Sequence, residues 1–246
     1  LMYGLPGQSM DDLDQTIDQV ITLKPSRIAL FGYAHLPSQF PRQKRIDSAT
    51  LPDADMRFRQ SEHGYCRLVD AGYRAIGFDH FALPDDGLAI AAEDGRVHRN
   101  FQGFTDDPSK TVIGLGASAI SIFPGLLAQN EKNPGRYRML LSDNRLPVAR
   151  GVQRDFDDRR RNDIIEGLLC RGMARIECDM LRRTVRDRLY GFEQRGLVRW
   201  CGEDLTIPET ALPYARLIAA AFDTRFRWTE TPAMEHRSPD RTAIAV

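Results

Sequence analysis

The sequence predicts a mixed α/β protein: the C-terminal part of a partial parallel (β/α) barrel, followed by a small helical domain that resembles a winged helix. Two observations lead to this prediction. Short apolar runs alternate with amphipathic helical segments over residues 1–147, which is the pattern of βαβ units. Helical patterns then dominate residues 148–227, with one hairpin among them. We expect residues 228–246 to be a disordered tail, because they are polar and lack periodicity.

The first unit reads as strand, turn and helix. Residues 1–3 are apolar and strand-like, and a Gly/Pro turn follows them. Ser9, with Asp12 three residues later, resembles a capping box that starts a helix. Pro25 stops this helix, and an almost continuous apolar strand follows over residues 27–33. Such a strand is buried on both faces, as in a parallel sheet.

The same pattern then repeats twice. A polar helical segment over residues 53–70 ends at Gly72, and a short strand follows over residues 73–78. In the third unit, a strand is predicted over residues 112–120, which are rich in small side chains. Helices between strands predict right-handed βαβ units, so we expect these strands to pair in parallel.

The C-terminal part begins after about Pro147. One helix face is predicted around residues 164–169, and a second over residues 181–192 ends at Gly196. A small hairpin over residues 197–207 and a last helix over residues 212–222 complete the domain. Helices followed by a hairpin resemble a winged-helix unit.

Charge and hydropathy exclude several classes of protein. Lys and Arg together number 34 and so do Asp and Glu, so no overall field attracts nucleic acid or anionic lipid. No stretch approaches the run of about 18 apolar residues that spans a bilayer, and no secretory signal opens the chain. We therefore expect a cytoplasmic protein without a membrane or nucleic-acid partner. Because Leu1 opens directly into a strand, we also expect the chain to be a fragment.

The cysteines do not form a recognisable metal site. Neither a CxxC pair nor a CxxxCxxC run occurs among Cys66, Cys170, Cys178 and Cys201. Because cysteine is also a common buried apolar residue, we expect a structural role for all four. The sequence therefore predicts no metal ligands in this chain.

The ends of the predicted strands are where chemistry is expected, because function in parallel barrels collects there. His35 and His80 lie at matching strand ends, and each is able to exchange protons or pair with a carboxylate near neutral pH. The alternative is that both are satisfied structural histidines. Asp79 adjoins His80, but no HxH or HExxH spacing supports a metal site there.

Two further segments are candidate binding loops. Gly114 and Gly116 leave room for a ligand to approach the backbone, and their amides are able to receive an adenosyl group or a carboxylate. Close helix and strand packing explains such glycines equally well. In the second segment, Arg99, Phe101 and Gln102 combine a cation, an aromatic ring and an amide. That mixture suits an apolar macrocycle with carboxylate edges, although a solvated loop is the alternative.

Six ordered sequence blocks resemble the oxygen-independent coproporphyrinogen III oxidase family, often called HemN. They are residues 1–8, 33–37, 77–86, 88–89, 98–103 and 114–121. Two of them, Asp-His-Phe-Ala and His-Arg-Asn-Phe-Gln-Gly, are specific, because the related haem chaperones differ there. The resemblance runs from Leu1 to about Arg227.

The resemblance implies a barrel of the radical S-adenosylmethionine (SAM) type and a haem-synthesis enzyme. In the family, a [4Fe–4S] cluster and two SAM molecules support oxidative decarboxylation of two propionates of coproporphyrinogen III to vinyl groups, giving protoporphyrinogen IX. The implied partners are coproporphyrinogen III, an electron donor and an electron acceptor. The protein supplies binding and orientation, while the cofactors carry the difficult chemistry.

The resemblance also implies roles for individual residues at positions that match the family's motifs. Ala34 and Ile120 match positions that contact SAM in the family, and His35, Phe101 and Gln102 lie in motifs near the active site. The cluster motif CxxxCxxC is missing, so the resemblance implies that the cluster cysteines lie upstream and that the chain alone is inactive. Phe104-Thr105-Asp106 replaces the Tyr-Thr-Thr that is frequent in the family, and this change weakens polar contacts nearby rather than the fold.

Two rival interpretations remain open. The C-terminal unit is consistent with a winged-helix nucleic-acid-binding module, because one predicted helix carries four arginines. These arginines are Arg182, Arg183, Arg186 and Arg188. A solvated helix face is the alternative. The second rival is a radical SAM haem chaperone, which would bind haem tightly and would not decarboxylate a porphyrinogen.

Overall fold

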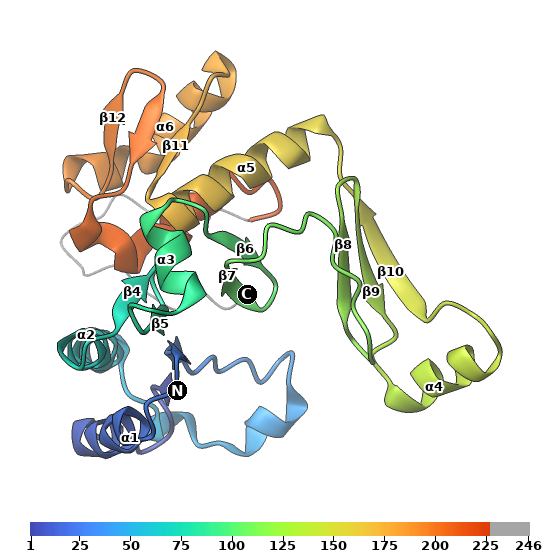
Figure 1. The fold of residues 1–246 in the computed structure, drawn as a ribbon, viewed down its shortest axis with the longest axis horizontal. Coiled ribbons are helices and arrows are strands. Elements are labelled where there is room, and N and C mark those ends of the chain that lie inside the picture. Colours follow the sequence, from blue (N-terminus) through green and yellow to red (C-terminus); the bar gives the residue numbers. More distant parts are fainter. Residues whose placement is uncertain (227–246) are drawn as a thin grey trace.

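A computed structural model describes residues 1–226 of the chain. The predicted disordered tail, residues 228–246, lies outside the described residues. Within the described part, no helix combines the length and the apolar character needed to cross a membrane. The mixed α/β class is confirmed, since helices and short strands alternate along the described chain (Figure 1).

The first unit forms in part as the sequence predicts. The strand predicted over residues 27–33 is instead divided into two short strands, Arg27–Ala29 and Phe31–Gly32, and it is not buried on both faces, since Phe31 is 41% exposed. Strand β1 (Met2–Tyr3) pairs in parallel with β3 (Phe31–Gly32), and helix α1 (Met10–Leu23) lies between them in the chain. The Ser9 side chain accepts a hydrogen bond from the Asp12 amide, and the Asp12 carboxylate accepts one from the Ser9 amide. This confirms the capping box, which satisfies amides that the helix cannot pair internally.

The neighbouring sheet is antiparallel, contrary to the prediction. Its order is β2-β5-β4, with β2 at Arg27–Ala29, β4 at Arg74–Ile76 and β5 at His80–Ala82. Strand β5 runs opposite to both neighbours. The predicted strands over residues 27–33 and 73–78 therefore lie in one sheet without pairing directly, because a tight turn at Gly77 (φ +61°) inserts β5 between them.

Two helices, α2 and α3, pack beside this sheet. Helix α2 (Ala54–Asp70) begins at Asp53, whose side chain accepts from the Met56 amide. Two short 3₁₀ helices, Pro41–Arg45 and Ser48–Thr50, precede α2 in the chain. Helix α3 (Gly87–Glu93) follows β5. The predicted helix over residues 53–70 is thereby confirmed.

The middle of the chain forms a hairpin and then a projecting lobe. Strands β6 (His98–Asn100) and β7 (Gly103–Thr105) make the hairpin. The lobe is an antiparallel sheet of order β10-β9-β8, with helix α4 (Pro134–Ser142) at its far end (Figure 1). Its strands are β8 (Ile120–Phe123), β9 (Leu126–Asn130) and β10 (Val148–Gln153).

The predicted parallel strand over residues 112–120 is wrong. Val112 makes an isolated antiparallel bridge with Ile122, and residues 113–119 form a loop. Gly116 and Ser118 adopt positive φ angles of +109° and +63°, which a strand does not accommodate. Small residues that suggested a buried strand instead allow a tight loop.

The C-terminal part contains the predicted helices and hairpin. Its helices are α5 (Phe156–Arg171), α6 (Asp179–Gln194) and α7 (Ala215–Ala220), with a 3₁₀ turn at Glu209–Tyr214 before α7. The hairpin strands are β12 (Arg199–Cys201) and β13 (Asp204–Thr206). A third strand that the sequence did not indicate, β11 (Met173–Arg175), pairs with β13 and gives the order β11-β13-β12.

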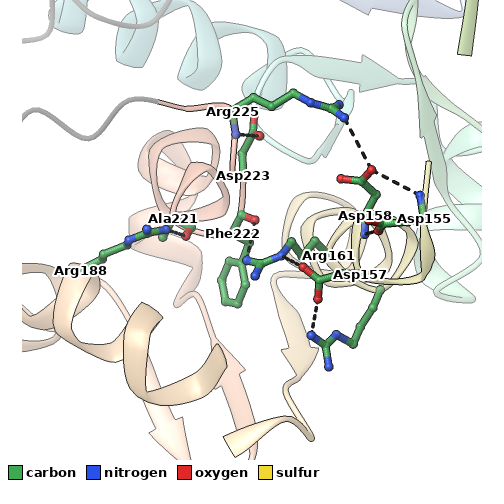
Figure 2. A network of polar contacts seen from close by, with 10 residues as sticks. Asp155, Asp157, Asp158, Arg161, Arg188, Ala221, Phe222, Asp223 and Arg225 are labelled. Carbon is green, nitrogen blue, oxygen red and sulfur yellow. Dashed lines mark hydrogen bonds and ion pairs between the residues drawn. The ribbon is translucent and has the colours of Figure 1, made fainter. Parts of the chain in front are cut away.

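Arginines from two helices hold the chain that leaves α7 (Figure 2). Arg188 of α6 donates to the Ala221 carbonyl at 2.8 Å, and Arg161 of α5 donates to the Phe222 carbonyl at 3.3 Å. Asp157 orients the Arg161 guanidinium through a 2.6 Å ion pair. Because carbonyls at the end of a helix lack partners within it, these arginines stabilise the packing of α7 against α5 and α6.

The buried side chains form two clusters. The smaller lies between α1, α2 and the β2-β5-β4 sheet, and it is built around Leu13, Ile17, Leu68 and Phe81. The larger combines residues from β4, β5, α3 and β7 with the C-terminal helices; its members include Leu88, Phe104, Leu168, Val185 and Ile218. The C-terminal helices are therefore packed on the α/β part through a common core.

Candidate active site

A carboxylate and a histidine lie together where β5 begins. The Asp79 Oδ1 and His80 Nδ1 atoms are 2.6 Å apart, and Asp79 is 7% exposed. The Asp79 carbonyl also accepts from the Leu30 amide at 2.8 Å, which fixes the turn against β2 and β3. This contact between the Asp79 carboxylate and the His80 ring fixes the orientation of the imidazole. The structure thus pairs two predicted site residues directly.

Aromatic rings and the β6–β7 hairpin enclose the His80 ring. Its ring centroid is 5.9 Å from that of Phe31 and 5.2 Å from that of Phe104, with edge-to-face geometry in both pairs. At Gly103, an added Cβ atom would lie 2.5 Å from His80 Nε2. The imidazole is therefore held by packing, which pre-organises it and makes a glycine necessary at position 103.

Arg99 joins this cluster from strand β6. Its Cζ atom lies 5.4 Å from the ring centroids of both Phe78 and Phe104, and those two rings are 5.5 Å apart. The guanidinium is thus held over aromatic faces. The neighbouring His98 does not approach Asp79, because its Nδ1 atom contacts Glu166 of α5 at 2.8 Å. Within residues 1–226, no three side chains of His, Cys, Asp or Glu converge as a metal ion requires.

Phe101 and Gln102 form the tip of the same hairpin. Phe101 is 60% exposed, and Gln102 is exposed as well. The Gln102 amide donates to the Asn100 side chain at 2.8 Å, which shapes the turn. Since the ring and the amide side chain point away from the packed core, both are available to a ligand.

Ala34 and His35 follow β3 in a loop that Gln43 holds. The Gln43 side chain donates to the Ala34 carbonyl at 2.9 Å and accepts from the Leu36 amide at 2.5 Å. His35 lies between Tyr33 and Ser48, with ring nitrogens 3.4 Å and 3.3 Å from the two hydroxyls. Because His35 has hydroxyl partners and no carboxylate partner among these contacts, it differs from His80. The predicted match of their positions is also wrong, since His35 lies in the loop after β3 whereas His80 begins β5.

Ile120 begins β8, beside the Gly114–Gly116 loop. The Gly114 amide donates to the Ser121 hydroxyl and the Gly116 amide to the Tyr137 hydroxyl, each at 3.0 Å. A Cβ atom at Gly114 would lie 2.7 Å from the Ile120 carbonyl oxygen. These amides already have partners in the chain, so close packing is the better interpretation of the two glycines. The buried Asn130 side chain completes the loop by donating to both glycine carbonyls.

The structure therefore brings together some of the predicted residues. Asp79, His80 and Arg99 share one cluster, and Phe31 connects that cluster to the strand before Ala34 and His35. Ile120 belongs to the projecting lobe. Sequence reasoning missed Arg216 of α7, whose Cζ atom is 5.6 Å from the Phe78 ring centroid. Its position on an otherwise apolar helix was the available indication.

Comparisons with known proteins identify relatives of this chain. The chain is 38% identical over 232 residues to the oxygen-independent coproporphyrinogen III oxidase of Pseudomonas aeruginosa, a match that covers 91% of this chain and 50% of that protein. The protein of the same name from Bradyrhizobium diazoefficiens is 37% identical, with 91% and 51% covered. This chain is homologous to the oxygen-independent coproporphyrinogen III oxidase family. No family model matches it.

A solved structure extends the homology to the fold. The coproporphyrinogen III oxidase (HemN) of Escherichia coli, described as a radical SAM enzyme, superposes with a TM-score of 0.84 at 32% identity. The match covers 92% of this chain and 54% of that one. The family resemblance read from the six sequence blocks is thus confirmed, and the chain spans about half the length of the curated relatives that it matches.

Proposed function

We propose that this chain forms the C-terminal half of an oxygen-independent coproporphyrinogen III oxidase, an oxidoreductase of haem synthesis. The complete enzyme would decarboxylate two propionates of coproporphyrinogen III oxidatively and give protoporphyrinogen IX. The supporting observation is the homology to coproporphyrinogen oxidases over 91% of the chain, together with the HemN-like fold. On this proposal the chain alone is inactive.

The cofactor residues of this chain are few. When bound, SAM and a [4Fe–4S] cluster would supply the radical chemistry of the reaction. The cysteines do not fit the cluster, since the four thiols lie on α2, on α5, at the start of α6 and on β12. Cluster ligands would therefore come from outside this chain. Ala34 and Ile120 are proposed to contact SAM, by their match to family positions.

The remaining site residues are proposed to hold the substrate. The exposed Phe101 ring is suited to stack on a macrocycle, and the Gln102 amide to donate at its edge. Arg99 offers a cation for a carboxylate. Asp79 orients His80 through their 2.6 Å contact, so the imidazole ring is held in a fixed position for proton exchange.

The finer architecture belongs to the same proposal. We infer that residues 1–147 complete a partial barrel of radical SAM type together with strands from the other half, and that residues 148–227 form a winged-helix-like unit. The sheet order β11-β13-β12 beside α6 supports the second inference. Partners would be coproporphyrinogen III, an electron donor and an electron acceptor, and the expected place of action is the cytoplasm.

The nucleic-acid alternative loses support from the contacts of α6. Arg182 donates to the Ile176 carbonyl at 2.8 Å, Arg186 contacts Glu193 at 3.2 Å, and Arg188 holds the end of α7. These three of the four arginines have partners within the chain, which counts against a free recognition face. The haem-chaperone alternative has weaker support than the oxidase, because the relatives are named as oxidases.

The test is reconstitution. The chain, and a fusion of the N-terminal half of the Pseudomonas relative to it, would be incubated without oxygen with coproporphyrinogen III, SAM and a reductant. We expect protoporphyrinogen IX, detected by chromatography after oxidation, from the fusion but not from the chain. A fusion that binds its cluster and cleaves SAM but makes no vinyl product would contradict the proposal, and tight haem binding would favour the chaperone.

A further inference from the structure

The β6–β7 hairpin is tied to two distant elements at its base. Its base rung pairs His98 with Thr105, and its tip is the exposed turn at Phe101 and Gln102. Each strand has three residues, and a two-stranded hairpin of this size is only marginally stable by itself. Phe104 packs in the core, but the direction of the tip also depends on how the base is held.

The first tie comes from helix α5. The His98 Nδ1 and Glu166 Oε1 atoms are 2.8 Å apart, although the two residues are separated by 68 positions in the chain. Glu166 is the more buried partner, with 24% of its side chain exposed against 43% for His98. Because α5 packs beside β6, this contact fixes the start of the hairpin against a helix of the C-terminal part.

The second tie comes from Arg27 of strand β2. Its Nη1 and Nη2 atoms donate to the two carboxylate oxygens of Asp106 at 3.2 and 3.3 Å, and its Nε atom donates to Asp86 at 2.7 Å. Asp86 is itself held, because it accepts from the Leu88 amide at the start of α3. Gly87 leaves room for the Asp106 carboxylate, since an added Cβ atom would lie 2.7 Å from its Oδ2 atom. Such a two-bonded pair is directional, so it fixes the chain just after β7.

We propose that Glu166 and Arg27 are positioning residues, which hold the base of the hairpin so that Phe101 and Gln102 meet the porphyrinogen in one fixed orientation. This rests on the proposed function. Neither positioning residue needs to touch the ligand, because a loop that is ordered before binding loses less conformational freedom when the ligand arrives. One tie comes from α5 and the other from β2, so both parts of the chain control the same binding loop.

The experiment measures binding and does not depend on turnover. The full chain would be titrated with coproporphyrin III, the stable oxidised form of the macrocycle, and porphyrin fluorescence would report the dissociation constant. We expect Glu166→Ala and Arg27→Gln each to weaken binding by about 3-fold, as for a partly exposed ion pair. The two changes together should weaken it by about 10-fold, because the ties are independent. Hydrogen exchange in residues 98–105 should rise in each variant.

A double-mutant cycle separates positioning from general destabilisation. The tip variant, Phe101→Ala with Gln102→Ala, removes the side chains through which the ties are proposed to act. In that background Glu166→Ala should weaken porphyrin binding by less than about 1.5-fold. Its effect on the urea midpoint should be the same in both backgrounds, because the tip is exposed.

Two further variants serve as rescue and control. Glu166→Gln should restore the affinity, because an amide both donates and accepts and is able to bond the His98 ring in either tautomer. Asp163→Ala removes an exposed carboxylate from the same helix and should leave porphyrin binding unchanged.

Three results would overturn the inference. They are wild-type affinity in both Glu166→Ala and Arg27→Gln, a loss of equal size in the tip variant, and a wild-type chain that does not bind coproporphyrin III. If one variant fails to fold, the other carries the test from a different element. A positive cycle combined with failed reconstitution would leave the positioning role standing at a porphyrin-binding hairpin and refute the oxidase.

Discussion

Gly77 shows how one residue shapes the site. It turns the chain from β4 into β5 at a φ of +61°, and an added Cβ atom would overlap the Phe104 ring. Phe104 in turn contacts Phe78, His80 and Arg99. The absence of a side chain at Gly77 is therefore what lets the rings and the guanidinium meet.

Replacing Gly77 with alanine should destabilise the protein by more than the strain of its positive φ angle alone would. Gly202 has a nearly identical φ of +60° and open space around it, so Gly202→Ala measures the strain of the angle. We expect Gly77→Ala to lower the free energy of unfolding by about 1–3 kcal/mol more than Gly202→Ala, because the ring cluster must shift. Urea denaturation of both variants measures this difference. Equal losses would show that Phe104 moves without cost.

Two cysteines should differ sharply in reactivity. Burial, with a smaller effect of Glu166, raises the pKa of the Cys170 thiol to about 12. At Cys178, hydrogen bonds from the Leu181 amide and the Arg160 side chain lower the pKa. Since the thiolate is the reactive form, iodoacetamide at neutral pH should modify Cys178 well before Cys170 in the folded protein.

Peptide mass spectrometry over a time course tests this order. Modification of Cys170 should require urea, and Arg160→Gln should slow the reaction of Cys178. Equal rates at the two thiols in native protein would contradict the assigned environments.

At the scale of elements, an ion-pair network joins α1 to α2. The Asp14 carboxylate contacts His63 Nε2 at 2.7 Å and also pairs with Arg67, which reaches Asp18 as well. The hydrogen bond from His63 is the main reason why the pKa of Asp14 is lowered. Both helices are amphipathic, so this network sits at the rim of the smaller buried cluster.

The lowered pKa of Asp14 sets the sign of a pH effect. A carboxyl group whose pKa is lower in the folded state contributes stability above its ordinary pKa of about 4, and this contribution is lost as pH falls through the folded value. We expect Asp14→Asn to lower the melting temperature at pH 6 and to have a smaller effect near pH 3. Because the group is partly exposed, a change of a few degrees is expected. An effect that grows on acidification would refute the pairing.

Elements set by local chemistry were predictable, whereas strand pairing was not. The start of α1 at Ser9 and the end of α6 are set by hydrogen bonds between residues close together in the chain. Both helix ends could therefore be located from the sequence. Strands β5 and β11 have three residues each, too few for a periodic pattern. Residues 112–120 read as a strand because their small side chains gave no sign that Asn130 and Tyr137 hold a loop there.

The site divides in the same way. Asp79, His80 and Arg99 could be named as candidates because each lies in a sequence block that resembles the family. Arg216 was not, because only tertiary packing brings α7 to Phe78. Long-range partners of a site leave little trace in a single sequence, except as a charged residue on an apolar helix.

At the scale of the whole molecule, the shared core couples the two parts of the chain. Leu168 of α5 is fully buried in the cluster that also contains Leu88 of α3. Leu168→Ala should therefore cost about 2–5 kcal/mol and raise amide hydrogen exchange in α3 as well as in α5. Leu13→Ala, in the other cluster, should first expose α1 and α2.

Hydrogen exchange measured by mass spectrometry distinguishes these patterns. An increase confined to residues after 147 in Leu168→Ala would instead mark an independent C-terminal domain at the predicted boundary.

Asn130 has a consequence for the lifetime of the protein. Its amide nitrogen donates at 3.0 Å to the carbonyls of both Gly114 and Gly116. Asparagine amides hydrolyse slowly to carboxylates, and here that deamidation would place an anionic acceptor against two other acceptors. The loop before Ile120 would be released while the helices kept their caps. An aged sample would thus lose its proposed cofactor contact before its circular dichroism changed.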